Sequence, residues 1–302
     1  MEESVLALSK VDKEELRFIF FKECKEIEKA KALAQHAIIA AYRNNNASLE
    51  LVFDFYTRHP GCLGYLFQFY RELISKKMKA FVIQFIKKLV DRIFEFYKID
   101  YKRDIIDSSY ETNLPFLRTV FYLGTLYHTS QDFENAINIY EKLIVLDPED
   151  LIGTRYALIK LYLKQHKYKR VLQLCNKYSD DETPIIMYGH ALALIKVGEK
   201  EKAREILKTA IKLHPLVAFN LLLESPSTAG KERSFVLQGG KYEATLYTQY
   251  YKEFWDEDAK KILMEFKDEI LTLAEKKKQE LINEESILNA LEDIKKKNNK
   301  TK

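Results

Sequence analysis

Apolar residues recur every three or four positions along most of the chain, which is the period of an amphipathic α-helix. The pattern predicts four helices before residue 99, over 12–43, 48–59, about 62–75 and 78–98. Ser9 or Asp12 is placed to cap the first of them. The asparagines at 44–46 and the Pro60-Gly61 pair mark breaks between helices.

The segment over 99–114 lacks the helical period. Its sequence, IDYKRDIIDSSYETNL, alternates charged residues with isoleucine and tyrosine, and it contains Asp107, Ser108 and Ser109 in a row. Clusters of aspartate and serine favour turns. We expect a connection that wraps onto the neighbouring helices and breaks their regular stacking.

The stretch from Phe116 to Pro148 has the spacing of a tetratricopeptide repeat, a helical hairpin of about 34 residues. The matching residues, at repeat positions 7, 8, 11, 20, 24 and 32, are Leu123, Gly124, Tyr127, Ala136, Tyr140 and Pro148. Small residues such as Gly124 let two antiparallel helices approach closely, and the tyrosines fill the space around them. Pro148 ends the second helix because it cannot donate a backbone hydrogen bond.

Two further hairpins follow the first. Helices over about 150–165 and 168–178 resemble a degenerate repeat. The third repeat has matches at positions 8, 20, 24, 27 and 32, which are Ala191, Ala203, Leu207, Ala210 and Pro215. The interval from Pro148 to Pro215 is 67 residues, close to two repeats of about 34. The middle of the chain therefore predicts three stacked helix pairs.

Past Leu223 the helical pattern fails through a long loop over 224–241, which is rich in glycine. Its Gly-Gly-Lys lacks the spacing of a phosphate-binding loop. Helices resume over about 242–255 and 257–281, with Asp256 as a candidate cap of the second. A thin apolar stripe and a lysine-rich tail occupy 284–302.

These patterns predict an all-α fold: a right-handed solenoid of tetratricopeptide-like helical hairpins with extra N- and C-terminal helices. We expect one helical-repeat domain over 1–275, with its repeat core at 116–223, and a charged helical or disordered tail over 276–302. The composition agrees, because nine glycines and six prolines among 302 residues are too few for the turns of a β-sandwich or barrel.

Charge and cysteine content restrict the function without assigning one. A net charge of +4 does not by itself demand a nucleic acid partner. The three cysteines, Cys24, Cys62 and Cys175, are odd in number and lack CxxC spacing, so we expect neither a disulfide framework nor a zinc site. This cysteine content favours a protein of a reducing compartment. The chain starts without a secretory signal and has no run of 18 apolar residues, which favours a soluble cytoplasmic protein that also has access to the nucleus.

The sequence contains no motif for catalysis. The six histidines form no HExxH or HxE pair, and no GxSxG elbow, glycine-rich nucleotide loop or paired-carboxylate motif occurs. We therefore expect that the protein is not an enzyme and has no cofactor, no metal, no small-molecule substrate and no membrane partner.

In tetratricopeptide arrays the first helix of each pair lines a concave surface, where repeat positions 2, 5, 9 and 12 point inward. This rule selects six candidate partner-binding residues: Arg118, Phe121, His128, Arg155, Tyr162 and Tyr188. An aromatic and basic lining suits an acidic peptide, because arginine forms paired hydrogen bonds to carboxylates. The alternative is that the 99–114 segment or the C-terminal helices cover these residues.

Lysines and arginines cluster at two places in the helical part of the chain and again in the C-terminal tail. One set is Lys76, Lys77, Lys79, Lys87 and Lys88, and the other is Lys164, Lys167, Lys169 and Arg170. Such faces suit contact with the phosphates of ribosomal RNA, which is salt-sensitive and independent of sequence. Simple solvation of the lysines accounts for them equally well.

The order of these features resembles one family, transcription factor 25, whose yeast relative is subunit 1 of the ribosome quality control complex. The strongest match is FLRTVFYLGTLYHTSQDFENAINIYEKLIVLDPED, in which Tyr140, Lys142, Leu143, Leu146, Asp147 and Pro148 carry the resemblance. Downstream, LYTQYYKEFWDEDAKKIL is similar to the family's helix that ends in an aromatic pair before an acidic cap. The resemblance covers roughly 45–275. Ser130 to Phe133 depart from the family's usual Arg-Gly-Cys.

The resemblance implies a non-catalytic adaptor of ribosome-associated quality control. Its expected partners are the ubiquitin ligase of that complex, ubiquitin, the 60S ribosomal subunit and the segregase ATPase that extracts stalled nascent chains. Two alternatives stay open. One is a peptide-binding cochaperone or assembly scaffold, and the other is a nuclear transcriptional repressor, which the near-neutral charge disfavours.

Overall fold

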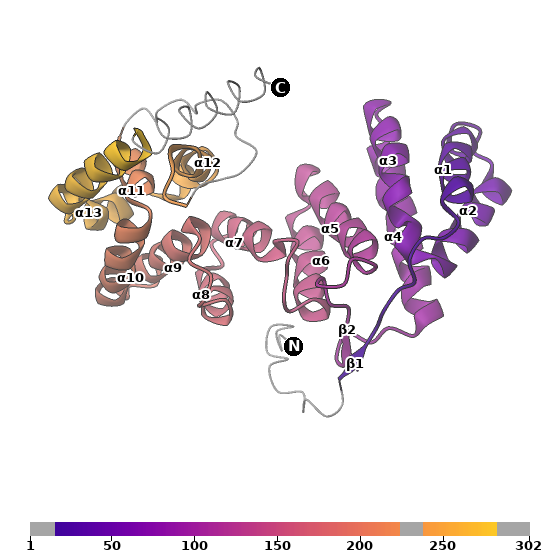
Figure 1. Ribbon diagram of the computed structural model, residues 1–302, viewed down its shortest axis with the longest axis horizontal. Helices are drawn as coiled ribbons and strands as arrows, with labels where there is room; N and C mark the ends of the chain where they lie inside the picture. Colours follow the sequence, from indigo (N-terminus) through magenta and orange to yellow (C-terminus); the bar gives the residue numbers. More distant parts are fainter. Residues whose placement is uncertain (1–15, 224–237, 283–302) are drawn as a thin grey trace, which may run out of the picture. The chain divides into compact units, whose positions relative to one another are not determined.

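The computed structural model describes residues 16–223 and 238–282 (Figure 1). The chain divides into two compact units, and the boundary falls between Leu161 and Tyr162. The single domain over 1–275 stays a prediction.

Most of the described part of the first unit is helical. Its helices are α1 (Ile27–Tyr42), α2 (Asn46–Arg58), the 3-10 helix η3 (Pro60–Tyr65), α3 (Leu66–Ser75), α4 (Lys79–Tyr97), α5 (Leu114–Thr129) and α6 (Phe133–Leu146). Helix α1 packs on α2 and α3, α2 on α4, α4 on α5, and α5 on α6. The Asn45 side chain begins α2 by accepting a hydrogen bond from the backbone N–H of Ser48 at 3.1 Å.

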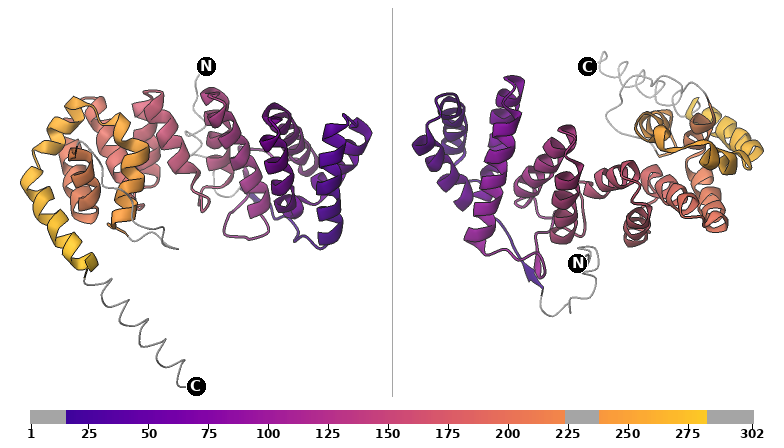
Figure 2. Two further views of the ribbon diagram at one scale, coloured as in Figure 1. Left: turned by 90° about the horizontal axis from the view of Figure 1, so that it is seen from above. Right: turned by 180° about the vertical axis from the view of Figure 1, so that it is seen from behind.

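The second unit continues the hairpins and then adds helices against them. Its helices are α7 (Thr154–Lys164), which begins before the division, α8 (Tyr168–Lys177), α9 (Pro184–Lys196), α10 (Lys200–Leu213), α11 (Pro215–Leu222), α12 (Lys241–Tyr251), the 3-10 helix η4 (Lys252–Phe254) and α13 (Glu257–Met264), followed by a helix over 267–282. Helix α12 packs on α11, and α13 packs on α9, α10 and α11 (Figure 2). The all-α helical-hairpin fold with extra terminal helices is confirmed.

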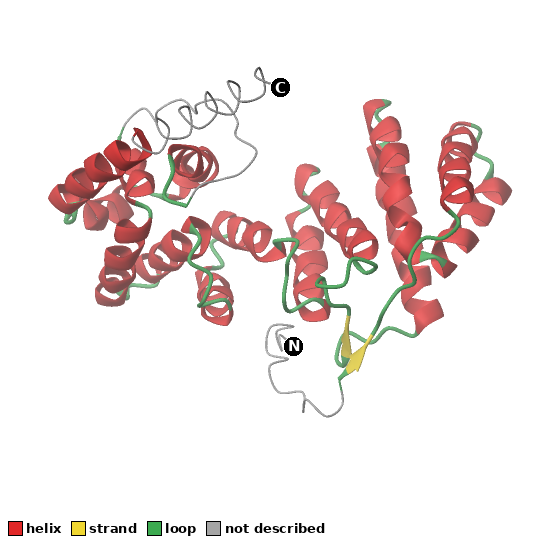
Figure 3. Ribbon diagram, in the orientation of Figure 1, coloured by secondary structure: helices red, strands yellow, loops and turns green. Residues whose placement is uncertain are grey.

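The prediction of a helix from residue 12 is wrong for residues 16–26, which are extended before α1 begins at Ile27. Strand β1 (Arg17–Phe18) pairs in parallel with β2 (Asp104–Ile105), shown in yellow in Figure 3. The guanidinium of Arg17 donates to the buried carboxylate of Asp104, with Nε 2.7 Å from Oδ1. This pairing with a distant segment overrides the helical spacing of the local sequence.

The connection between α4 and α5 wraps onto the helices as the sequence predicts. The backbone N–H of Ile106 donates to the carbonyl oxygen of Leu146, at the end of α6, at 2.7 Å. The fully buried Asn113 amide accepts from the N–H of Phe21 at 3.0 Å and donates to the carbonyl oxygen of Ile19 at 3.2 Å. One side chain therefore joins the extended N-terminal segment to this connection.

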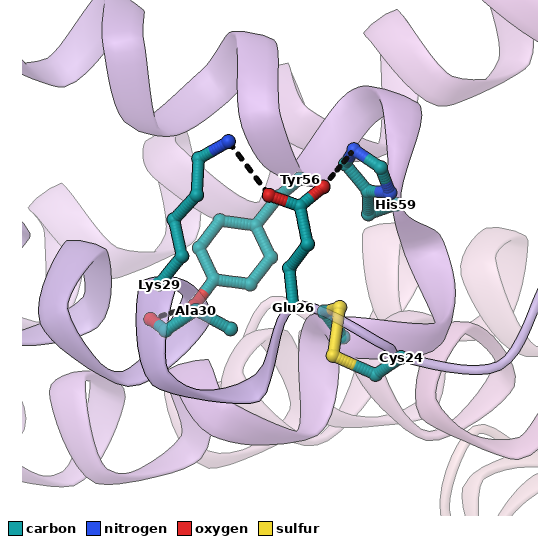
Figure 4. Close-up of a disulfide and its surroundings, with 7 residues drawn as sticks. Cys24, Glu26, Lys29, Ala30, Tyr56 and His59 are labelled. Atoms are coloured by element: carbon teal, nitrogen blue, oxygen red, sulfur yellow. Dashed lines mark hydrogen bonds and ion pairs between the residues drawn. A yellow bond between two sulfur atoms is a disulfide. The ribbon is translucent and has the colours of Figure 1, made fainter.

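Cys24 and Cys62 form a disulfide with their Cα atoms 4.8 Å apart, so the expectation of no disulfide is wrong (Figure 4). The two cysteines are 38 positions apart, so no local pattern predicts their pairing; the extended course of the segment before α1 brings Cys24 to η3. A Cβ atom on Gly61 would lie 2.2 Å from the carbonyl oxygen of Lys22, so the two backbones meet where only glycine fits. The third cysteine, Cys175, is free and buried.

The surroundings of the disulfide fix the start of α1. The Glu26 carboxylate lies 2.7 Å from the Lys29 ammonium and 3.3 Å from the Nε2 atom of His59 (Figure 4). The buried Tyr56 hydroxyl donates to the carbonyl oxygen of Ala30 at 2.8 Å. Helix α2 and η3 thus hold the first turn of α1 from two sides.

The close approach of α5 and α6 occurs at Gly124, as the repeat pattern predicts. A Cβ atom added there would lie 2.4 Å from Cε1 of Tyr140. The Tyr140 ring covers this glycine, and its hydroxyl lies 3.1 Å from Oγ1 of Thr125. The glycine and the tyrosine therefore form one packing unit.

A buried histidine joins the added helices to the repeats in the second unit. His214 is fully buried, with Nδ1 2.8 Å from Oε2 of Glu243 in α12 and Nε2 2.6 Å from the carbonyl oxygen of Glu182 before α9. Each ring nitrogen therefore faces one oxygen atom, from α12 on one side and from the segment before α9 on the other. Glu243 also accepts from the N–H of Gly239 at 2.7 Å.

Two helix boundaries near the C-terminal end test the sequence interpretation directly. The Asp256 side chain accepts from the N–H of Ala259 at 3.1 Å, which confirms the predicted cap of α13. The predicted helix over 257–281 is interrupted at 265–266 before it resumes. The Ser9 and Asp12 caps, the loop over 224–237 and the tail over 283–302 lie outside the described residues.

Within the described ranges, no helix is long and apolar enough to cross a membrane.

We expect Gly124→Ala to lower the free energy of unfolding by about 1–3 kcal/mol, because the added methyl group overlaps the Tyr140 ring. Urea denaturation followed by circular dichroism measures this change. The matched control is Gly64→Ala, where a Cβ atom meets no atom within 4 Å and alanine favours a helix. Equal destabilisation by the two substitutions would contradict the role assigned to Gly124.

Candidate protein-interaction surfaces

The six residues selected from the repeat positions fall on both units. Arg118, Phe121 and His128 lie on α5, Arg155 lies at the start of α7, and Tyr162 and Tyr188 lie in the second unit. We therefore describe each set within its own unit. Their role in binding a partner stays a prediction.

Helix α5 presents one exposed basic residue and two residues that pack within its hairpin. The Arg118 side chain is exposed. The half-buried Phe121 ring lies 5.2 Å from the ring of Tyr140, and His128 meets Phe133 edge-on with centroids 5.9 Å apart. Of these three residues, Arg118 is the one whose side chain is most open to a partner.

Arg155 is bound to the loop that precedes α7. Its Nη1 atom lies 2.8 Å from the carbonyl oxygen and 3.1 Å from Oδ2 of the buried Asp150, and its guanidinium stacks on Tyr156 at 4.4 Å. Asp150 in turn caps α7, because its carboxylate accepts from the backbone N–H groups of Thr154 and Arg155 at 2.7 and 2.8 Å. The guanidinium is therefore a stabilising contact of this loop.

Asp147, in the Leu-Asp-Pro sequence, anchors the same loop to the connection between α4 and α5. It is 1% exposed, and its Oδ1 accepts from the N–H and the hydroxyl of Ser108 at 3.0 and 2.8 Å. Among the described residues its Oδ2 atom is buried with no hydrogen-bond partner. Burial raises the pKa of the Asp147 carboxyl to about 6, against 3.8 ordinarily, because the charged form loses its hydration.

Tyr162 and Tyr188 are fully buried and do not line an open groove. The Tyr188 hydroxyl donates to the carbonyl oxygen of His214 at 2.9 Å, and burial raises the pKa of this phenol. Its ring packs against Tyr247 of α12, at 5.5 Å, and Trp255, at 6.1 Å. The C-terminal helices thus cover this position, which is the alternative that the sequence left open.

The second unit has a surface pocket of about 370 Å³ between α8, α9 and α10. The residues that line it are Leu172, Asn176, His190, Leu194, Glu199, Lys202, Glu205 and Ile206. The leucines and the isoleucine give it an apolar floor. The repeat-position rule missed it because most of the lining comes from α8 and α10, the second helices of their hairpins.

Charged side chains border this pocket on one side. The Lys202 ammonium lies 2.5 Å from Glu199, and this hydrogen bond raises the pKa of Lys202. Burial lowers the pKa of His190, so its imidazole is neutral at pH 7. Glu205 adds a second carboxylate to the pocket lining, besides that of Glu199. The pocket thus suits an apolar side chain of a partner protein. Among the described residues, no group of three or more potential metal ligands lies close enough together to hold an ion.

Comparisons with known proteins give a family match and distant structural likenesses. A family model described as transcriptional repressor TCF25 matches residues 113–302, from the residue before α5 onward. Similar solved structures include crystal structures of nearly identical tetratricopeptide-like repeats of a Podosopora anserina kinesin light chain, with 14% identity over 61% of this chain and 92% of that one, at a TM-score of 0.37. A point variant of that protein gives the same coverage at a TM-score of 0.36. No curated protein matches the chain.

We expect Tyr188→Phe to lower the free energy of unfolding by about 1 kcal/mol, because the His214 carbonyl oxygen loses one of its two donors and keeps the N–H of Val217. Thermal or urea denaturation measures the change. Arg118→Ala, at an exposed position, is the comparison variant and should stay within about 0.5 kcal/mol of wild type. A Tyr188→Phe protein as stable as wild type would show that this hydroxyl has no structural role.

We expect Asp147 to make the protein more stable as the pH falls from 7.5 to 5. The pKa of the Asp147 carboxyl is about 6 in the folded protein, which is above its pKa in the unfolded chain. Protonation of this carboxyl therefore favours folding, and the stabilisation that it gives is lost as the pH rises through 6. The difference in unfolding free energy between wild type and Asp147→Asn should shift by about 1 kcal/mol over this range. Urea titrations at each pH measure it, and parallel pH profiles for the two proteins would contradict the assignment.

Proposed function

The chain belongs to the transcriptional repressor TCF25 family, and from this membership we propose that it is a non-catalytic adaptor of ribosome-associated quality control. In this role it binds the 60S-associated ubiquitin ligase and ubiquitin. It promotes degradative ubiquitin chains on stalled nascent chains and helps the segregase ATPase to extract them. It acts in the cytoplasm and also has access to the nucleus.

The observation that supports this proposal is a family match that spans every helical hairpin from α5 onward. A helical-repeat protein of this family has a protein-interaction role, because stacked hairpins offer long surfaces to other chains. The pocket at α8, α9 and α10 offers one place where a partner's apolar side chain would be anchored. An adaptor needs such surfaces and no reactive group.

Transcriptional repression is a second candidate, because the family's description names it. It requires sequence-specific binding to DNA or to a DNA-bound protein. The two candidates predict different partners in cells, so one purification separates them.

We expect a tagged form of the full chain, purified from cells with stalled ribosomes, to recover 60S subunits and the ubiquitin ligase. Adding the purified protein to a reconstituted ligase reaction should increase the share of degradative chain linkages. Mass spectrometry of the partners and of the ubiquitin linkages measures both effects. Absence from 60S fractions together with unchanged linkages would reject the adaptor role.

Two substitutions test whether the ubiquitin ligase binds at the pocket between α8, α9 and α10. Ile206→Glu places a charge in the pocket, and Leu271→Glu places the same charge at an exposed apolar position of the same unit. Loss of the ligase with Ile206→Glu alone assigns the contact to the pocket. Retention with both variants leaves the adaptor role intact and moves the contact elsewhere.

A further inference from the structure

The extended segment before α1, residues 16–26, forms a strap that is attached to the rest of the first unit at its start, its middle and its end. Near its start, β1 pairs with β2. In its middle, the Asn113 side chain accepts one hydrogen bond from the backbone of the strap and donates another to it. Near its end, the disulfide joins Cys24 to Cys62 in η3. The disulfide is the attachment that a change of redox state can remove.

Residues 22–25, at the end of the strap, depend on this disulfide. Within the described ranges, none of these four residues makes a hydrogen bond or an ion pair. The side chains of Lys22, Glu23 and Lys25 are exposed. The backbone of Lys22 also meets that of Gly61, and this contact is one of packing. Apart from packing, the disulfide is therefore what keeps this part of the chain in place.

The chain on both sides of residues 22–25 is held by contacts that do not involve sulfur. On one side, the buried Phe21 ring packs edge-on against Phe116, with ring centroids 5.0 Å apart. On the other side, the Glu26 carboxylate lies 3.3 Å from Nε2 of His59, beside the start of α1 (Figure 4). Loss of the disulfide therefore frees residues 22–25 and leaves the rest of the fold in place.

The two cysteines differ in their access to solvent. Cys24 is partly exposed on the strap, whereas Cys62 is 1% exposed. Thiol–disulfide exchange requires that a thiolate reach a sulfur atom and displace the sulfur bonded to it. A small thiol from solution therefore attacks at Cys24, and Cys62 is the thiol that leaves.

We propose that Cys24 and Cys62 form a reversible redox lock on the strap, with glutathione and glutathione disulfide as its reaction partners. To close the lock, the Cys24 thiolate attacks glutathione disulfide, which forms a mixed disulfide and releases one glutathione thiolate. The Cys62 thiolate then attacks the Cys24 sulfur and releases the second glutathione. Two electrons and two protons pass from the cysteines to the two glutathione molecules. Opening is the same exchange in reverse.

The lock controls how freely residues 22–25 leave the surface of the first unit. A segment that few contacts hold opens locally at a small cost in free energy. In the oxidised protein the covalent bond to Cys62 prevents this opening. In the reduced protein the segment opens, and other proteins can reach the chain around Lys22 and Lys25.

The lock does not rest on the proposed function, because the strap precedes the residues that the family model matches, 113–302. The two proposals also fail separately. The state of the lock is measured on the purified protein without a partner, and recovery of the ligase requires no change of redox state.

The test is limited proteolysis of the full chain with trypsin, in a buffer with glutathione disulfide and in one with a reductant. Trypsin cleaves after lysine, and Lys22 and Lys25 flank Cys24. Cleavage needs several residues to detach from the fold, so its rate follows the local opening. We expect cleavage at these two lysines to be at least about 10-fold faster in the reduced protein. Mass spectrometry measures the fragments and, after alkylation, the free thiols.

The internal control is cleavage at Lys76 and Lys77, in the exposed turn between α3 and α4. Its rate should change less than about twofold between the two buffers, because no disulfide holds that turn. Cys24→Ser cannot close the lock and should be cleaved at the reduced rate in both buffers. Cys175→Ala keeps both cysteines of the lock and should respond as wild type does. Circular dichroism should show that both variants fold.

Return of the protein from the reductant to glutathione disulfide should restore both the disulfide and the slow cleavage. Equal cleavage of the oxidised and reduced wild type after Lys22 and Lys25 would overturn the proposal. So would thiols that stay unpaired in glutathione disulfide, or a redox response that persists in Cys24→Ser.

Discussion

Buried polar side chains hold the connections between the helices, and the arrangement of the hairpins depends on them. Asn113, Asp147, Asp150 and His214 are each at most 1% exposed, and each lies beside a connection. A buried polar group without a partner costs about 1–3 kcal/mol, so each of these side chains favours one course of the chain over its alternatives. Apolar contacts give the helices their stacking, and these four residues determine where one helix leads to the next.

The helices could be predicted from the sequence because their signals are local. Asp256, the prolines and the 3.6-residue period each act within a few positions of the feature that they specify. The extended segment before α1 could not be predicted in the same way. Arg17 and Asp104 are 87 residues apart, and the local spacing of Leu16, Ile19 and Phe20 also suits a helix. A long-range pairing prevailed over a local preference.

The interaction surfaces were harder to predict than the fold. The repeat rule identifies the inward side of each first helix, but it cannot show what covers that side. Tyr188 is covered because Tyr247 and Trp255, distant in the sequence, pack against its ring. The pocket around His190 depends on the spacing of three helices, and no single stretch of sequence records it. The charge on the α7–α8 turn is visible in the sequence, yet its exposure becomes clear only with the turn in place.

The disulfide gives the molecule two covalent forms, and the compartment decides which one exists. In a cytoplasm kept reducing by glutathione, Cys24 and Cys62 would be thiols. The segment before α1 would then be held by non-covalent contacts, among them Asn113, the pairing with β2 and the ion pair of Arg17 with Asp104. In air the same protein closes a loop between residues 38 apart, which restricts the unfolded chain and adds about 2–4 kcal/mol. A stability measured on the oxidised protein therefore describes a more constrained molecule than the reduced form.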